Sequence, residues 1–273
     1  MRLNYSIFYR EQIIDENKFE DLLTNQKIKV YCILHGLFGR GKNWHSVAKL
    51  ISKNCEHIFL TLDLRNHGEN LPSNEISYDL MVTDLFELTK QHNLKTISLI
   101  GHSMGGKVSM LFALNFPDII ENLIVVDIAP IKYKSDNNIE IINNLLKVNI
   151  NNIQSRSDAE IVLSKTINDK SLRLFLLQNL KKTNHGYIWS SNLNAFKEGM
   201  ENLRDFPYIG LQQYLKNTLC IYGDLSSYIT EENKKVFRHY FPNIKFEKIE
   251  NAGHWLHAEK PRYFVETICK YLI

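Results

Sequence analysis

A serine flanked by glycines stands where the chain changes from a strand-like to a helix-like pattern. Residues 96–100 (TISLI) indicate a buried strand, residues 107–116 indicate a helix that stops before a proline, and Gly101-His102-Ser103-Met104-Gly105 lies between them. A sharp strand-to-helix turn needs small neighbours, because it holds the serine in a strained backbone conformation. The helix N-terminus beneath the serine also favours negative charge. This context predicts that Ser103 is a nucleophile.

A serine hydroxyl needs a base, and two histidines near the C-terminus are candidates. His254 follows a strand-like run at 245–249, and its position fits the chain order of nucleophile, acid and base that accompanies such a turn. His257 lies three residues further on, and a short loop could present either ring. We favour His254 on chain order and context, and we expect His102, beside the serine, to serve packing or support.

The acid that would orient the imidazole is open between two aspartates. In most proteins with this turn the acid lies three residues after a loop glycine, which here is Ser226, and a serine cannot act as a carboxylate. Asp127 ends the strand that follows the Ser103 helix, and Asp224 directly follows the loop glycine, Gly223. Strand ends at one sheet edge can converge on one site, so we favour Asp127 over Asp224. A turn-capping role is the plainer interpretation of Asp127.

The oxyanion that develops during acyl transfer needs two N–H donors. Met104, the residue after the nucleophile, is expected to supply one, and the loop of residues 35–39 (HGLFG) the other. The loop's first glycine lets the backbone approach closely, so Leu37 is the expected donor and Phe38 the alternative. We expect an acyl pocket to take apolar surface from Phe38, Met104 and Trp255. For Trp255, packing in the core is an equally good interpretation.

Strands and helices alternate along most of the chain. Strands are predicted at 28–34, 57–62, 96–100, 123–126, 218–222 and 245–249, and helices at 44–53, 78–93, 107–116, 231–240 and 261–271. This order predicts an α/β fold with a mostly parallel sheet and helices on both faces. The first 27 residues are expected to hold one or two edge strands. We expect residues 1–130 and 211–273 to form the core, and 131–210 to form a helical cap insertion.

Composition excludes several classes of function. The 273 residues carry a net charge of +3, which is too small to suggest nucleic-acid binding. No apolar run is long enough to span a membrane, and the first residues lack the apolar core of a signal peptide. The four cysteines form no CxxC pair, and Cys32 and Cys220 fall in apolar strands, where they are expected to be buried. These features favour a cytoplasmic monomer or homodimer that needs no metal or organic cofactor.

Five motifs together resemble the α/β-hydrolase superfamily, and they are found at residues 35–39, 63–68, 101–107, 127–130 and 252–261. The pieces Arg-Asn-His-Gly and Asp-Ile-Ala-Pro look more narrowly like the YbfF-type esterases and thioesterases. The resemblance implies hydrolysis of short- to medium-chain acyl esters or acyl-CoA thioesters, and it supports Asp127 because the family keeps an aspartate there. A lyase, a cofactor-free perhydrolase and a non-catalytic ligand-binding relative are the alternatives on this fold.

Overall fold

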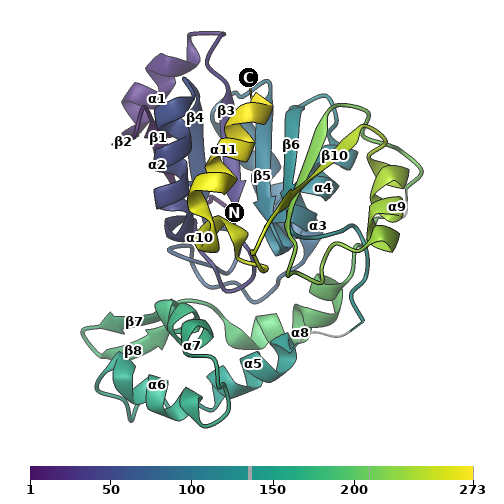
Figure 1. Ribbon diagram of the computed structural model, residues 1–273. Helices are drawn as coiled ribbons and strands as arrows, with labels where there is room; N and C mark the ends of the chain where they lie inside the picture. The colour runs from purple at the N-terminus through teal and green to yellow at the C-terminus, as the bar shows by residue number, and fades with distance from the viewer. Residues whose placement is uncertain (135–136, 209, 273) are drawn as a thin grey trace.

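One large sheet organises the computed structural model, which describes residues 1–134, 137–208 and 210–272 (Figure 1). Across these residues the sheet has eight strands in the order β10-β9-β6-β5-β3-β4-β1-β2. Every neighbouring pair from β10 to β4 is parallel, whereas β1 runs antiparallel to β4 and β2. The strands are β1 (Tyr5–Tyr9), β2 (Gln12–Ile14), β3 (Val30–Leu34), β4 (Ile58–Leu62), β5 (Ile97–His102), β6 (Ile120–Val126), β9 (Thr218–Gly223) and β10 (Ile244–Ile249).

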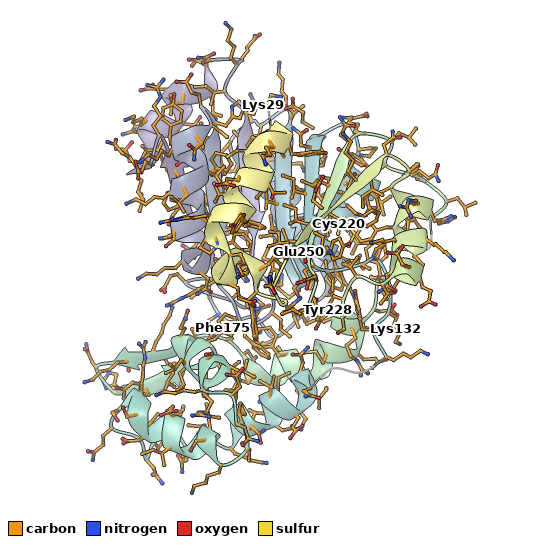
Figure 2. The ribbon with its side chains drawn as sticks, viewed as in Figure 1. Lys29, Lys132, Phe175, Cys220, Tyr228 and Glu250 are labelled. Carbon is orange, nitrogen blue, oxygen red and sulfur yellow. The ribbon has the colours of Figure 1, made fainter. Side chains whose placement is uncertain are left out.

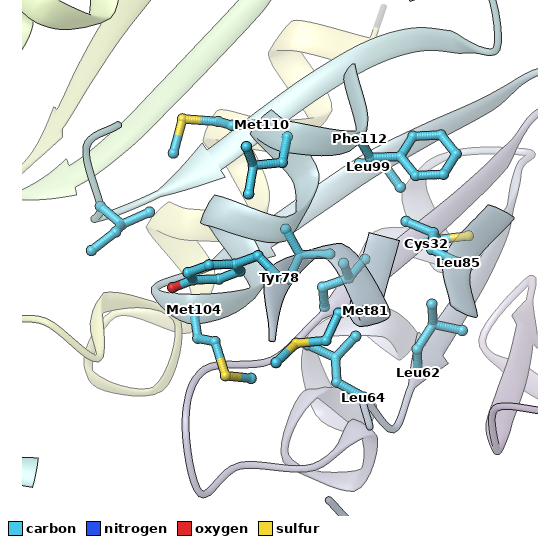
Figure 3. Packing of buried hydrophobic residues seen from close by; sticks show 14 of the residues in the cluster. Cys32, Leu62, Leu64, Tyr78, Met81, Leu85, Leu99, Met104, Met110 and Phe112 are labelled. Carbon is cyan, nitrogen blue, oxygen red and sulfur yellow. The ribbon is translucent and has the colours of Figure 1, made fainter. Parts of the chain in front are cut away.

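The central strands are apolar on both faces, which is typical of a parallel sheet covered by helices on each side. In β3, Tyr31 and Ile33 share one apolar cluster with α2 and α11, and Cys32 and Leu34 share another with α3 and α4. Figure 3 shows the second cluster around Leu99 of β5. The helices of the core are α1 (Glu16–Leu23), the 3-10 helix η1 (Gly41–Trp44), α2 (His45–Asn54), α3 (Tyr78–Gln91), α4 (Met104–Asn115), α9 (Glu231–Tyr240), α10 (Leu256–Glu259) and α11 (Pro261–Leu272).

The predicted α/β-hydrolase architecture is confirmed, and each strand predicted from the sequence is present. The edge strands expected within the first 27 residues are β1 and β2, which are accompanied by helix α1. Cys32 and Cys220 are fully buried, as expected. The main shift of a boundary is at the serine, where β5 reaches His102 and α4 begins at Met104, so a single residue separates the strand from the helix.

The segment between β6 and β9 lies beyond the carboxyl ends of the parallel strands (Figure 1). We call its described residues 137–208 the insert. It contains α5 (Asn138–Leu146), α6 (Arg156–Ser164), α7 (Lys170–Leu176), the 3-10 helix η2 (Leu177–Asn179), the strands β7 (Leu180–Thr183) and β8 (Gly186–Trp189), and α8 (Leu193–Arg204). The expectation of helices alone was incomplete, because β7 and β8 form an antiparallel hairpin. The aromatic and β-branched residues of β8 favour a strand, whereas the lysines of β7 conceal it in the sequence.

Candidate active site

Ser103 occupies a strained turn between β5 and α4. Its backbone has φ +52° and ψ −118°, a region that side-chain-bearing residues rarely adopt. The turn is closely packed, because a Cβ added to Gly101 would lie 2.3 Å from the Gly105 carbonyl oxygen. A Cβ added to Gly105 would lie 2.5 Å from the carbonyl oxygen of Leu34. Glycine at both positions therefore lets the strand and helix approach closely enough to present the serine at the sheet edge.

His254 and Asp127 meet at the same edge. The two side chains are joined by a hydrogen bond of 2.7 Å between His254 Nδ1 and Asp127 Oδ2. Asp127 directly follows β6, is fully buried, and also accepts hydrogen bonds from the Ser226 hydroxyl on Oδ2 and from the Gly223 N–H on Oδ1. Ser226, at the position where an acid was looked for in the sequence, thus donates to the carboxylate that follows the neighbouring strand.

The two alternative residues make other contacts. Asp224 is exposed, and its Oδ1 accepts the N–H of Ala252 at 3.2 Å. His257 is buried and stacks on Trp44, with ring centroids 4.1 Å apart. Burial lowers the pKa of His257 to about 3. The structure thus places Asp127, rather than Asp224, against His254, and it keeps the His257 ring in an apolar stack.

Two adjoining cavities open at Ser103. The first has a volume of about 360 Å³ and the second about 340 Å³, and both are bordered by Ser103, Leu37 and Tyr228. The first is lined by Tyr78, Met104, Lys107, Tyr133, Met200 and Arg204. The second is lined by Phe38, Trp44, Phe175, His254 and Trp255. The cavities lie between the core and the insert, where Figure 2 labels Tyr228 and Phe175.

The loop of residues 35–39, which we call the oxyanion loop, follows β3 as a tight turn. The Gly39 N–H donates to the Gly36 carbonyl at 3.0 Å, and Phe38 has φ +60°. The Phe38 N–H donates to His67 Nε2 at 3.2 Å and is therefore directed toward that ring. This contact leaves Leu37, which borders both cavities, as the candidate donor from the loop.

Comparison with known proteins places this geometry in a family. A family model described as the alpha/beta hydrolase fold matches residues 30–261. The chain belongs to this family. It is 37% identical over 244 residues to the sn-1-specific diacylglycerol lipase ABHD11 of Danio rerio, covering 88% of this chain and 77% of that one. It is 34% identical to a putative esterase/lipase of Haemophilus influenzae, covering 93% and 87% of the two chains.

A similar enzyme and a solved structure extend the likeness. The Escherichia coli esterase YbfF is 28% identical over 240 residues, covering 88% of this α/β hydrolase and 91% of YbfF. A solved marine microorganism esterase is 31% identical, covers 99% of each chain and superposes with a TM-score of 0.88. Within the residues that the structure describes, no helix is both long and apolar enough to cross a membrane.

Two residues of the α/β-hydrolase site were missed in the sequence. The Tyr228 ring stacks on the His254 imidazole, with centroids 4.1 Å apart and an interplanar angle of 19°. Lys107, 2% exposed, lines the first cavity, and its ammonium donates to the carbonyls of Arg204 and Asp205 at 2.7 and 2.8 Å. Tyr228 lies two positions after Ser226, but nothing in its spacing marks it. Lys107 ends the motif at residues 101–107, but nothing in that motif marks it as buried or as part of a cavity wall.

Neutral histidines support the backbone around the site. Burial lowers the pKa of both His67 and His102 well below the ordinary value, so both rings are neutral near pH 7. His102 Nε2 lies 2.9 Å from the His254 carbonyl, to which it donates. His35 Nε2 accepts the Leu64 N–H at 3.0 Å.

Among the described residues, no group of three or more His, Cys, Asp or Glu side chains is placed to hold a metal ion.

Proposed function

We propose that the protein is a serine hydrolase that cleaves short- to medium-chain carboxylic esters or acyl thioesters through a covalent acyl-Ser103 intermediate. The observation that carries this proposal is the hydrogen bond between His254 and buried Asp127, because His254 borders the same cavity as the strained Ser103. The similar proteins are named as lipases and esterases, which supports an ester-cleaving role.

In the first half of the reaction, Ser103 Oγ attacks the carbonyl carbon while His254 Nε2 takes its proton. Asp127 accepts the hydrogen bond from His254 Nδ1, which fixes the tautomer that carries a lone pair on Nε2 and stabilises the imidazolium that forms. The N–H groups of Leu37 and Met104 donate to the oxyanion. Each such donor contributes on the order of 10²–10³ in rate.

The first half ends when the ester or thioester bond breaks and leaves an acyl-serine bond, and in the second half water hydrolyses that bond. The imidazolium of His254 gives its proton to the leaving alcohol or thiol, so the tetrahedral intermediate collapses to acyl-Ser103. The same ring, neutral again, takes a proton from water as the water oxygen attacks the acyl carbon. Collapse of the second intermediate returns the proton to Ser103 and releases the acid. This sequence consumes one water and needs no redox partner.

The insert acts in this proposal as the cap that encloses the substrate. It supplies Phe175 to the second cavity and Met200 to the first, while Phe38 and Trp255 contribute apolar surface from the core. Trp255 is 36% exposed and lies near Phe175, with centroids 6.2 Å apart, so it lines the mouth of the second cavity. The acyl chain of an ester or acyl-CoA fits the second cavity, because mainly apolar pockets with few polar groups bind acyl chains, whereas the first cavity is lined by polar residues such as Lys107 and Arg204.

A chain-length series tests the proposed function. The purified protein is assayed with p-nitrophenyl esters from acetyl to dodecanoyl, and with the matching acyl-CoA series by thiol release. We expect turnover that Ser103→Ala abolishes, and a fluorophosphonate adduct on Ser103 seen by intact mass and peptide mapping. No acyl turnover above the Ser103→Ala background, together with no label on Ser103, would overturn the assignment. The two series separate ester from thioester cleavage.

A further inference from the structure

The oxyanion loop depends on an unusual peptide at its centre. Phe38 is the third residue of the turn closed by the Gly39 to Gly36 hydrogen bond, and its φ of +60° is one that residues with a side chain rarely adopt. A positive φ at this position is typical of a type II turn, which glycine usually occupies. Contacts outside the loop must therefore stabilise this form against the alternative in which the Leu37–Phe38 peptide is turned over.

His67 holds the N–H side of this peptide. The ring is fully buried, its Nδ1 donates to the Arg65 carbonyl at 2.8 Å, and its Nε2 accepts the Phe38 N–H at 3.2 Å. Because Nδ1 carries the proton, the neutral ring presents a lone pair at Nε2. A turned-over peptide would direct the Leu37 carbonyl oxygen at that lone pair, since the N–H and C=O of a trans peptide point in opposite directions. His67 thus favours one orientation of the loop.

Asn179 holds the next peptide from the side of the insert. It belongs to η2, is 5% exposed, and its Nδ2 donates to the Phe38 carbonyl at 2.8 Å. The Phe38 ring packs edge-on against Phe196 of α8, with centroids 5.5 Å apart. The N–H and the C=O of Phe38 are therefore both engaged, one by the core and one by the insert.

We propose that His67 and Asn179 are positioning residues that together hold the oxyanion loop, so that the insert contributes to the oxyanion hole as well as to the walls of the pocket. This inference rests on the proposed function, in which the Leu37 N–H stabilises the oxyanion. Neither residue borders the cavities that open at Ser103, so neither has a place in binding the substrate. Their loss acts on the transition state more than on the bound substrate.

Paired variants of His67 separate this role from general support of the fold. The amide of glutamine can place an oxygen acceptor near the position of Nε2, whereas asparagine is too short to reach beyond Nδ1. We expect His67→Asn to lower kcat about tenfold to a hundredfold, a fraction of what a lost donor costs, with KM changed less than threefold. His67→Gln restores most of kcat. The affinity for a trifluoromethyl ketone, which forms an oxyanion on Ser103, falls in parallel with kcat.

Asn179→Ala provides a second, independent test, in which the change lies in the insert. Its matched control is Asn194→Ala, at an exposed position on α8. We expect Asn179→Ala to show the same loss of kcat and of trifluoromethyl ketone affinity, and Asn194→Ala to match the wild type. Thermal unfolding confirms that each variant is folded. If His67→Asn fails to fold, the kcat and the ketone affinity of His67→Gln and Asn179→Ala decide whether the inference holds.

The outcomes distinguish this inference from the proposed function. Folded His67→Asn and Asn179→Ala that keep kcat and ketone affinity within twofold of the wild type overturn the inference alone. Equal losses in His67→Gln and His67→Asn, with KM rising as much as kcat falls, also overturn it. A wild type without turnover that depends on Ser103 overturns both.

Discussion

Asp127→Asn removes the charge of the proposed acid while keeping its size. Oδ2 of Asp127 accepts from His254 Nδ1 at 2.7 Å and from the Ser226 hydroxyl, and Oδ1 accepts from the Gly223 N–H at 3.3 Å. An asparagine offers one oxygen and one NH₂ group in their place. An NH₂ group at the Oδ1 position would face the Gly223 N–H, donor against donor. We therefore expect the NH₂ group to take the position of Oδ2.

In that position the amide reverses the tautomer of His254. The NH₂ group donates to Nδ1, so the imidazole proton moves to Nε2, which can no longer accept the proton of Ser103. The corresponding change in a Ser-His-Asp protease lowers kcat by about 10⁴. We expect a loss of the same order, equivalent to about 5.4 kcal/mol of transition-state stabilisation. KM should change far less, because the cavity walls are untouched.

Asp224→Asn is the matched control for this change. Asp224 is exposed and accepts the Ala252 N–H, so its replacement should leave kcat within about threefold of the wild type, the scale of a solvated contact. Both variants are assayed with the best p-nitrophenyl ester, after thermal unfolding shows that they are folded. Near wild-type turnover by Asp127→Asn, or a loss of several orders of magnitude in Asp224→Asn, would refute the reasoning.

Three further predictions concern residues that support the site. Ser226→Ala should lower kcat about tenfold or more in the ester assay, because a hydrogen bond to a charged group contributes about 1.5–3 kcal/mol, whereas Ser226→Thr, which keeps the hydroxyl, should retain activity. The pKa of His257 falls from 6.5 to about 3 on folding, so its contribution to stability is complete above pH 6.5 and is lost as the pH decreases toward 3. Urea unfolding should show that, between about pH 7 and pH 5, the wild type loses about 2 kcal/mol more of its free energy of unfolding than His257→Phe does. Gly101→Ala should lower the free energy of unfolding by about 1–3 kcal/mol or more in the same measurement, because its Cβ would lie 2.3 Å from the Gly105 carbonyl oxygen. An unchanged unfolding midpoint would contradict this.

The core could be predicted from the sequence because local pattern and tertiary role coincide there. The strand TISLI is apolar on both faces, and the glycines around Ser103 are placed by steric need, so the strand, turn and helix were each visible as residue types. The mostly parallel pairing of the strands followed from their alternation with helices, whereas their order in the sheet is known only from the structure. The insert was harder, because Leu180–Thr183 contains two lysines and becomes a strand only by pairing with Gly186–Trp189.

Contacts between distant segments could not be predicted in this way. Tyr228 stacks on His254, and Asn179 donates to Phe38 across 141 positions of sequence, and neither contact leaves a local pattern. The same holds for His67, whose motif was noticed but whose ring could not be assigned to the Phe38 N–H. The proposed positioning residues depend on geometry that only the packed chain creates, whereas the proposed nucleophile and base have fixed places relative to strand ends.

The position of Asp127, the proposed acid, shows why a carboxylate that follows either of two neighbouring strands can lie at the same sheet edge. β6 and β9 are parallel neighbours with Val126 opposite Ile221, so the residues that follow them emerge side by side. The Asp127 N–H extends this pairing by donating to the Ile221 carbonyl at 2.9 Å. A carboxylate that follows β6 can therefore contact His254, because it lies next to the residues that follow β9. The hydroxyl of Ser226 occupies that second position, after β9, and donates to Asp127 Oδ2, a buried oxygen that would otherwise have His254 as its single partner, so Ser226 supports the proposed acid.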